Sequence, residues 1–169
     1  KLLGTRTEVN DAMMRGTLLE PYISMAYEEL RSIVVTPGEC YVSDAYPVCS
    51  ASLDGEHGDT IIEIKTVNGH AFRSGEWGDE MTDEIPQYYF IQIQHQLAVT
   101  QRDEARLVAL VAEGETFDLL VDLVNELSIG ARWMVTKQIK RIGLKEYVIK
   151  RDAELSETIL QAESDWWQK

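Results

Sequence analysis

Apolar side chains recur with two different periods along this chain, and the period predicts where helices and strands lie. From residue 16 to residue 31 they recur every three or four positions, which indicates a helix with one buried face. From Thr60 to Val67 β-branched residues dominate, and a Gly-rich turn separates this run from a shorter strand that ends at Asp54. We therefore expect a helix and, after it, a β-hairpin.

The second half of the chain shows the same mixture of periods. A helix is predicted from Pro86 to about residue 101, and Tyr89, Ile93 and Leu97 form its apolar stripe. A buried strand is predicted at residues 106–113, and a strand, a helix cap and a final helix follow from residue 146 onward.

Residues 116–143 leave two assignments open. Residues 117–127 fit a short helix, whereas residues 132–142 fit either a basic strand or a basic helix. Residues 68–85 are predicted to form a long polar loop, and loops of that length in a compact domain are usually functional or mobile.

The composition indicates one soluble domain. With 169 residues, 44% hydrophobic and 27% charged, the chain is long enough for a single core and too short for two ordinary domains. No apolar run approaches the roughly 18 residues that span a bilayer, so we expect no membrane association. Cys40 and Cys49 are too few for a four-cysteine iron-sulfur cluster, and we expect them to be reduced and buried in a cytoplasmic protein.

The net charge of −13 argues against non-specific binding of nucleic acid through a broad positively charged surface. It leaves open a site that meets phosphate through a bound metal, because the carboxylates that hold the metal add to the negative total. Any basic channel must then be local, and the candidates for it are Arg73, Lys137, Lys140, Arg141 and Lys145.

The predicted hairpin carries charge in an unusual place. Side chains alternate along a strand, so Glu63 and Lys65 share one face while Ile62 and Ile64 share the other. The turn brings Asp54 opposite them, and two carboxylates beside a lysine indicate a possible binding site for a divalent metal ion. The plainer alternative is a solvated edge strand with a same-face ion pair worth about 0 to 1 kcal/mol.

Three motifs resemble those of the YqaJ-type viral recombinase, or lambda exonuclease, family of the PD-(D/E)XK nuclease superfamily. Asp54 followed by Glu63-Ile64-Lys65 is similar to the superfamily signature, although Leu53 stands where the family usually has proline. The run from Met14 to Pro21, MRGTLLEP, resembles the opening "RG...LEP" motif. The third motif, "P..Y..Q.Q..L.VT", is matched from Pro86 to Thr100.

The resemblance implies roles for particular residues. Asp54 and Glu63, with the Ile64 carbonyl and Glu20, would ligate one or two Mg²⁺ ions, with Mn²⁺ as a substitute. Lys65 would lie beside the attacking water. Glu20 has an alternative role, because Thr17 and Glu20 have the spacing of a capping box that begins a helix near Pro21.

Glutamine supports the metal site and the attacking water in this family, which implicates Gln94 or Gln92. Gln92, Gln94 and Gln96 cannot all share one helical face. Trp77, in the preceding loop, would either contact DNA or pin that loop to the surface.

The resemblance also implies the fold and the activity. We expect an α/β (α+β) fold with a restriction-endonuclease-like core, a mixed central sheet flanked by helices, in one nuclease domain over residues 1–169. The implied activity is a Mg²⁺-dependent 5′ to 3′ exonuclease that acts on ends of double-stranded DNA during phage recombination. The alternatives are an endonuclease of the same superfamily and a DNA-binding or assembly module without catalysis.

By resemblance, the protein would form a homotrimeric ring and cooperate with a single-strand annealing protein in the cytoplasm of a bacterial host. Relatives carry a further N-terminal helical segment with a phosphate-contacting arginine, and we expect that segment to be missing before Lys1.

Overall fold

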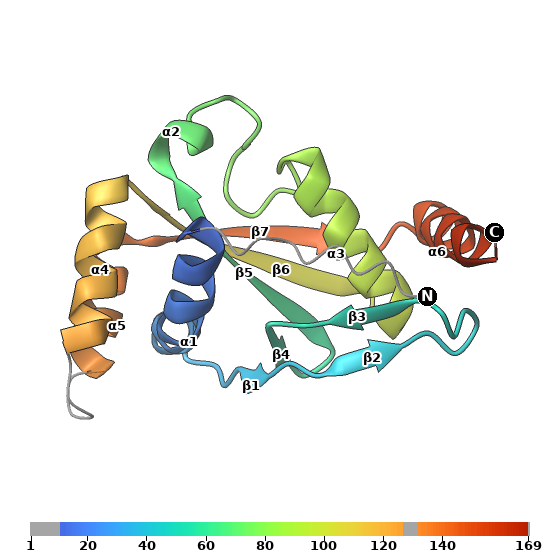
Figure 1. Ribbon diagram of the computed structural model, residues 1–169, viewed down its shortest axis with the longest axis horizontal. Coiled ribbons are helices and arrows are strands. Elements are labelled where there is room, and N and C mark those ends of the chain that lie inside the picture. The colour runs from blue at the N-terminus through green and yellow to red at the C-terminus, as the bar shows by residue number, and fades with distance from the viewer. Residues whose placement is uncertain (1–10, 127–131, 169) are drawn as a thin grey trace.

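The computed structural model describes residues 11–126 and 132–168 (Figure 1). Its helices are α1 (Asp11–Arg31), α2 (Gly69–Phe72), α3 (Gln87–Thr100), α4 (Gly114–Glu126), α5 (Arg132–Ile142) and α6 (Ala153–Trp167). Its strands are β1 (Thr36–Pro37), β2 (Cys40–Val42), β3 (Ser50–Ser52), β4 (Gly55–His57), β5 (Thr60–Asn68), β6 (Glu104–Ala112) and β7 (Leu144–Lys150).

Five strands form the central sheet in the order β1-β4-β5-β6-β7. β5 and β6 are parallel, and the other neighbours are antiparallel, so the predicted mixed sheet of an α/β fold is confirmed. Parallel neighbours cannot be joined by a tight turn, and the chain crosses from β5 to β6 through α2 and α3. β2 and β3 form a separate antiparallel pair.

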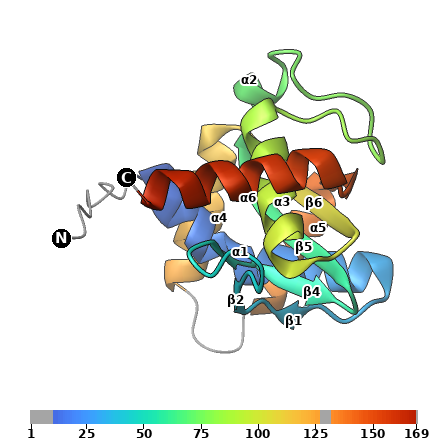
Figure 2. The same ribbon diagram turned by 90° about the vertical axis from the view of Figure 1, so that its right-hand side faces the viewer.

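Alternation along β5 sends its side chains into two cores on opposite faces of the sheet. Ile62 and Ile64 pack with α1, α4 and α5, whereas Ile61 and Val67 pack with α3. The two helices predicted first, α1 and α3, therefore cover opposite faces. α6 packs on the outer side of α3, where Figure 2 shows it crossing the molecule.

Several predicted boundaries are wrong. The strand predicted at residues 106–113 is β6, which starts and ends earlier, and the loop predicted at residues 68–85 begins with the short helix α2. α1 begins at Asp11, earlier than residue 16, and Pro21 lies inside the helix. The hairpin is formed by β4 and β5, and its first strand follows Asp54 instead of ending there. The turn is correspondingly short, with Gly58 at a positive φ of 57° that favours glycine.

Residues 132–142 form a helix, which resolves the open assignment. Val135 and Ile139 are fully buried, whereas Lys137 between them is exposed. A strand would place all three side chains on one face, so this pattern suits a helix. α4 confirms the helix predicted at residues 117–127, except that residue 127 lies outside the described residues.

The loop after α2 is held down by an aromatic cluster. The Trp77 ring lies with its centroid 5.4 Å from Phe72, 5.8 Å from Tyr89 and 5.2 Å from Tyr147. Trp77 therefore pins the loop to the domain, as one of the two interpretations of it predicted. In the described part of the chain no helix is both long and apolar enough to cross a bilayer.

Both cysteines are free. Cys49 is buried as expected, but the expected burial of Cys40 is wrong, because Cys40 begins the short strand β2 with its side chain exposed.

Candidate active site

The site forms where the short strand β4 stops pairing with β5. β4 reaches only from Thr60 to Ile62 of β5. Asp54 stands directly before β4 and takes the next place along this edge, where its Oδ2 accepts the Ile64 backbone N–H at 2.8 Å. Because the N–H and C=O of an extended residue point to the same side, the Ile64 carbonyl faces the same edge.

Glu63 points to the face that α3 covers, and only 1% of its surface is exposed. Three side chains donate to its carboxylate. Oε1 accepts from Lys65 Nζ at 2.5 Å and from Gln92 Nε2 at 2.7 Å, and Oε2 accepts from Gln96 Nε2 at 2.7 Å. A buried carboxylate needs such donors, because burial without them costs several kcal/mol.

The glutamines of α3 divide between its two sides. Gln92 and Gln96 are one turn apart and both reach Glu63. Gln94 points elsewhere: its Nε2 donates to the Lys150 carbonyl at 2.7 Å, and its Oε1 accepts the Asp152 N–H at 2.9 Å. Gln94 therefore ties β7 to α6, and the structure does not bring it to the carboxylates.

Lys65 connects the buried Glu63 with solvent, since 20% of its side chain is exposed. Its Nζ lies 5.5 Å from the centroid of the Tyr89 ring, an arrangement that allows a cation–π attraction. Tyr89 in turn packs on Trp77. The aromatic cluster thus forms one wall beside the ammonium group.

Glu20 reaches the same site from the middle of α1. It lines a cavity of about 420 Å³ together with Asp54, Ile64, Lys65 and Tyr89. The capping alternative for Glu20 is wrong, because α1 begins nine residues earlier and Thr17 Oγ1 donates to the Met13 carbonyl. Burial raises the pKa of Glu20, and the charge of Glu63 raises it further.

Crowding of carboxylates shows most clearly at Asp54. Burial and the charge of Glu63 raise the pKa of Asp54 to about 7, although the Ile64 N–H and the charge of Lys65 act in the opposite direction. An added cation would relieve this repulsion. The donors available are carboxylate and carbonyl oxygens, which suit a hard divalent ion such as Mg²⁺.

Within residues 11–126 and 132–168, no three acidic, histidine or cysteine side chains are gathered closely enough to hold a metal by themselves. Mg²⁺ is commonly bound by one or two carboxylates, with waters and substrate phosphates completing its shell. Asp54 and Glu63 with the Ile64 carbonyl therefore fit such an ion in kind and number.

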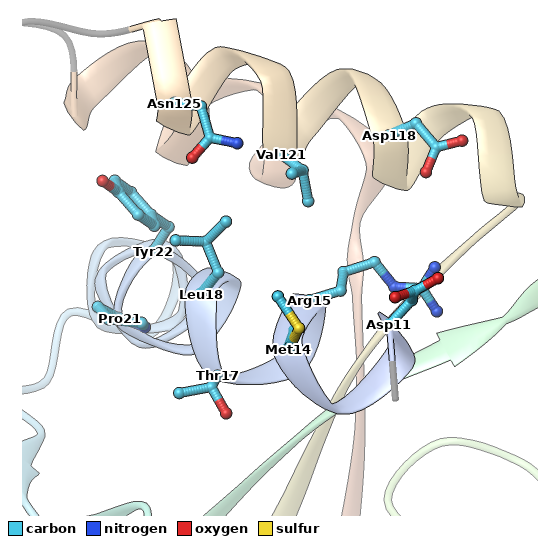
Figure 3. A pocket seen from close by; sticks show the side chains of 10 residues that line it. All are labelled: Asp11, Met14, Arg15, Thr17, Leu18, Pro21, Tyr22, Asp118, Val121 and Asn125. Atoms are coloured by element: carbon cyan, nitrogen blue, oxygen red, sulfur yellow. The ribbon is translucent and has the colours of Figure 1, made fainter. Parts of the chain in front are cut away.

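A larger cavity of about 910 Å³ lies between α1 and α4 (Figure 3). It is mostly apolar, and the Arg15 guanidinium within it lies 4.4 Å from the Phe117 ring centroid. None of the predicted site residues lines it. Cavity volume therefore does not identify the candidate active site in this protein; the positions of the carboxylates do.

Most of the predicted basic candidates are neutralised by carboxylates. Arg73 pairs with Glu113 at 2.8 Å, Lys140 pairs with Glu29, and Lys145 pairs with Glu80. Lys137 stands over the Trp133 ring instead, 5.6 Å from its centroid, and Arg141 is exposed.

Sequence reasoning missed Gln96, although a signal for it existed. Once Gln92 is assigned to the site, the residue one helical turn later must share its face, and that residue is Gln96. The spacing therefore favoured Gln96 over Gln94.

Comparison with known proteins gives a consistent result. A family model for the YqaJ-like viral recombinase domain matches residues 2–103. Among solved structures, LHK-Exo in complex with dAMP superposes with a TM-score of 0.59 at 25% identity, covering 94% of this chain and 73% of that one. No curated protein matches the chain.

Two further structures share the fold. LHK-Exo of Laribacter hongkongensis, described as an alkaline exonuclease, gives a TM-score of 0.58 at 24% identity and covers 95% of this chain and 74% of that one. A phage-related exonuclease of Haemophilus somnus 129PT gives 0.59 at 16% identity, with 94% and 71% coverage.

Proposed function

Because the chain belongs to the family of YqaJ-like viral recombinase domains, we propose that it is a phage-type exonuclease that hydrolyses double-stranded DNA from its 5′ ends during recombination, with Mg²⁺ as its cofactor. One observation carries the proposal. Asp54, Glu63 and Lys65 converge at the open edge of β5, where burial and the nearby charge of Glu63 raise the pKa of Asp54 to about 7. Such perturbed groups in a cleft are typical of active sites.

Asp54, Glu63 and the Ile64 carbonyl would hold Mg²⁺, with Glu20 as a further ligand or as the acceptor for a water on the ion. When bound, Mg²⁺ would lower the pKa of a water and stabilise charge on the scissile phosphate. Mn²⁺ is expected to substitute, because it also prefers oxygen ligands.

The side chains of this chain supply orientation and charge. Lys65 bridges the buried Glu63 and the open cavity, so its ammonium can hydrogen-bond the attacking water or a phosphate oxygen while its partner stays fixed. Gln92 holds Glu63 Oε1 from the other side. Gln94 has no part in this proposal, because both ends of its amide are engaged at the start of α6.

Its assembly is proposed on the family's pattern alone. We propose a homotrimeric ring that works with a single-strand annealing protein in the cytoplasm of the bacterial host. Analytical ultracentrifugation of the purified protein would test the trimer directly.

Digestion of linear duplex DNA and of covalently closed circles, each with Mg²⁺ or with EDTA, tests the activity. The proposal predicts that only linear DNA is degraded, only with metal, and that Lys65→Ala is inactive. Cleavage of the circle would instead identify an endonuclease, and no cleavage of either substrate would favour a binding module. A duplex protected at one 5′ end by phosphorothioates would then report the direction of digestion.

A further inference from the structure

Glu63 Oε2 depends on a residue that the third motif spans but does not specify. Gln92 and Lys65 both bind Oε1, and of the described residues only Gln96 donates a hydrogen bond to Oε2. We propose that Gln96 is a positioning residue that fixes the Glu63 carboxylate and its distance from Asp54 for metal binding. This inference rests on the proposed metal-dependent function.

The contacts of Gln96 require an amide at this position. Its Nε2 donates to Glu63 Oε2 at 2.7 Å and to the Ser52 carbonyl at 3.3 Å. Both partners are acceptors only, so a group with two N–H bonds satisfies both, whereas a carboxylate or a hydrocarbon satisfies neither. Only 3% of Gln96 is exposed, which leaves little access for a water to replace it.

Gln96 does not maximise stability. Its Oε1 is buried and has no hydrogen-bond partner among the residues that the structure describes, and an unmade hydrogen bond of this kind is costly. A core position on α3 selected for packing alone would carry leucine or methionine, as at Leu97. The presence of an amide at this buried position therefore points to a role in orienting Glu63.

The hydrogen bond from Gln96 to the Ser52 carbonyl links Glu63 to the segment that carries Asp54. Ser52 ends β3, and Asp54 follows two residues later at the edge of β5. By holding the Ser52 carbonyl and Glu63 with one amide, Gln96 fixes the segment that carries Asp54 relative to β5. Residues that orient ligands in this way typically change metal affinity 10- to 100-fold when they are replaced.

Gln96→Met tests the inference, and Gln94→Met is its matched control. Both positions are buried on α3, and each glutamine amide makes two hydrogen bonds, but those of Gln94 lie at the β7–α6 junction. Mg²⁺ or Mn²⁺ alone is titrated into each purified protein by calorimetry, without DNA, and thermal unfolding is recorded alongside.

We expect both variants to unfold at lower temperature, and only Gln96→Met to bind the metal about 10- to 100-fold more weakly. The Mg²⁺ concentration that this variant needs for half-maximal DNA cleavage should rise by a similar factor, while KM for DNA stays unchanged. Gln96→Asn, which keeps the amide on a shorter side chain, should be intermediate, and it serves if the methionine variant does not fold.

Metal affinity equal in Gln96→Met, Gln94→Met and the wild type would overturn the positioning role and leave the proposed function standing. A wild-type protein that binds neither ion would overturn the metal-dependent function itself, and the role of Gln96 with it.

Discussion

Lys65 Nζ lies 2.5 Å from Glu63 Oε1, and the two residues stand two positions apart on the same face of β5. Their surroundings differ: Glu63 is 1% exposed, whereas 20% of the Lys65 side chain reaches solvent. The pair is therefore not the solvated ion pair of an edge strand. Lys65 therefore places a positive charge at the wall of an open cavity while its ammonium group stays bound to the buried Glu63.

Lys65→Ala should lower DNA cleavage by about 10²- to 10⁴-fold while the protein remains folded. Glu63 keeps two amide donors in the variant, so we expect a stability loss of only about 1 to 2 kcal/mol. Lys145→Ala, which removes an exposed lysine paired with Glu80, is the control and should retain activity. Loss of folded protein in Lys65→Ala would show that the pair is structural.

Asp54→Asn should abolish cleavage and yet stabilise the protein in alkaline solution without metal. The pKa of Asp54 is raised from 3.8 to about 7, so folding favours its protonated form, and stability falls as pH rises between these values. Asparagine removes this dependence while its Oδ1 can still accept the Ile64 N–H.

Thermal unfolding should therefore show equal stability of wild type and Asp54→Asn near pH 4 and a gain for the variant on the order of 2 kcal/mol at about pH 8. Added Mg²⁺ should raise the melting temperature of the wild type at the higher pH and have no effect on the variant. A variant that is less stable at both pH values would contradict the repulsion between Asp54 and Glu63.

Glu20→Gln should weaken the stimulation of cleavage by Mg²⁺ about 10-fold or more, with little change in stability. Burial and the nearby Glu63 raise the pKa of Glu20, so neutralising it relieves repulsion. Glu29→Gln, on the same helix and paired with Lys140, is the matched control. If both variants respond to Mg²⁺ like the wild type, Glu20 has no part in the site.

Glu146→Gln should destabilise the protein by about 2 kcal/mol at neutral pH and leave cleavage unchanged. Glu146 is buried, accepts from Tyr27 and Arg106 at 2.9 and 2.6 Å, and forms an ion pair with Arg31. It joins α1, β6 and β7 away from the carboxylate site.

The pH dependence of this loss follows from the pKa of Glu146. Burial alone would raise that pKa, but the bonds from Arg106 and Tyr27 and the charge of Arg31 hold it below 4.5. Its contribution is present above that value and disappears as pH falls through the lowered pKa. Denaturant unfolding at neutral pH and at about pH 3 should show the difference between wild type and variant shrinking in acid.

The local patterns predicted the elements that carry the site, because those elements have simple periods. Alternation along β5 predicted that Glu63 and Lys65 share a face, and the stripe of Ile93 and Leu97 predicted α3. The start of α1 was not predictable in this way: Thr17 and Pro21 imitate a helix start, whereas the helix passes through both. Tertiary packing of Leu19 and Ile23 on the sheet outweighs that local signal.

Motif spacing also could not tell which glutamine serves the site. Gln92 and Gln94 both match the motif, and only the direction in which α3 packs on the sheet decides that Gln92 reaches Glu63 whereas Gln94 is buried at the end of β7. That direction depends on long-range contacts, among them the anchoring of Gln94 at the start of α6.

Trp77 lies close enough to the carboxylate site for its fluorescence to report on that site. Trp77 is partly buried against Tyr89, whose ring faces Lys65, while Trp133, Trp166 and Trp167 are exposed. Iodide should therefore quench the three exposed indoles preferentially and leave a blue-shifted emission from Trp77. The chain thus carries an intrinsic fluorophore two contacts away from its candidate catalytic lysine, and ligand arrival there can be followed without a label.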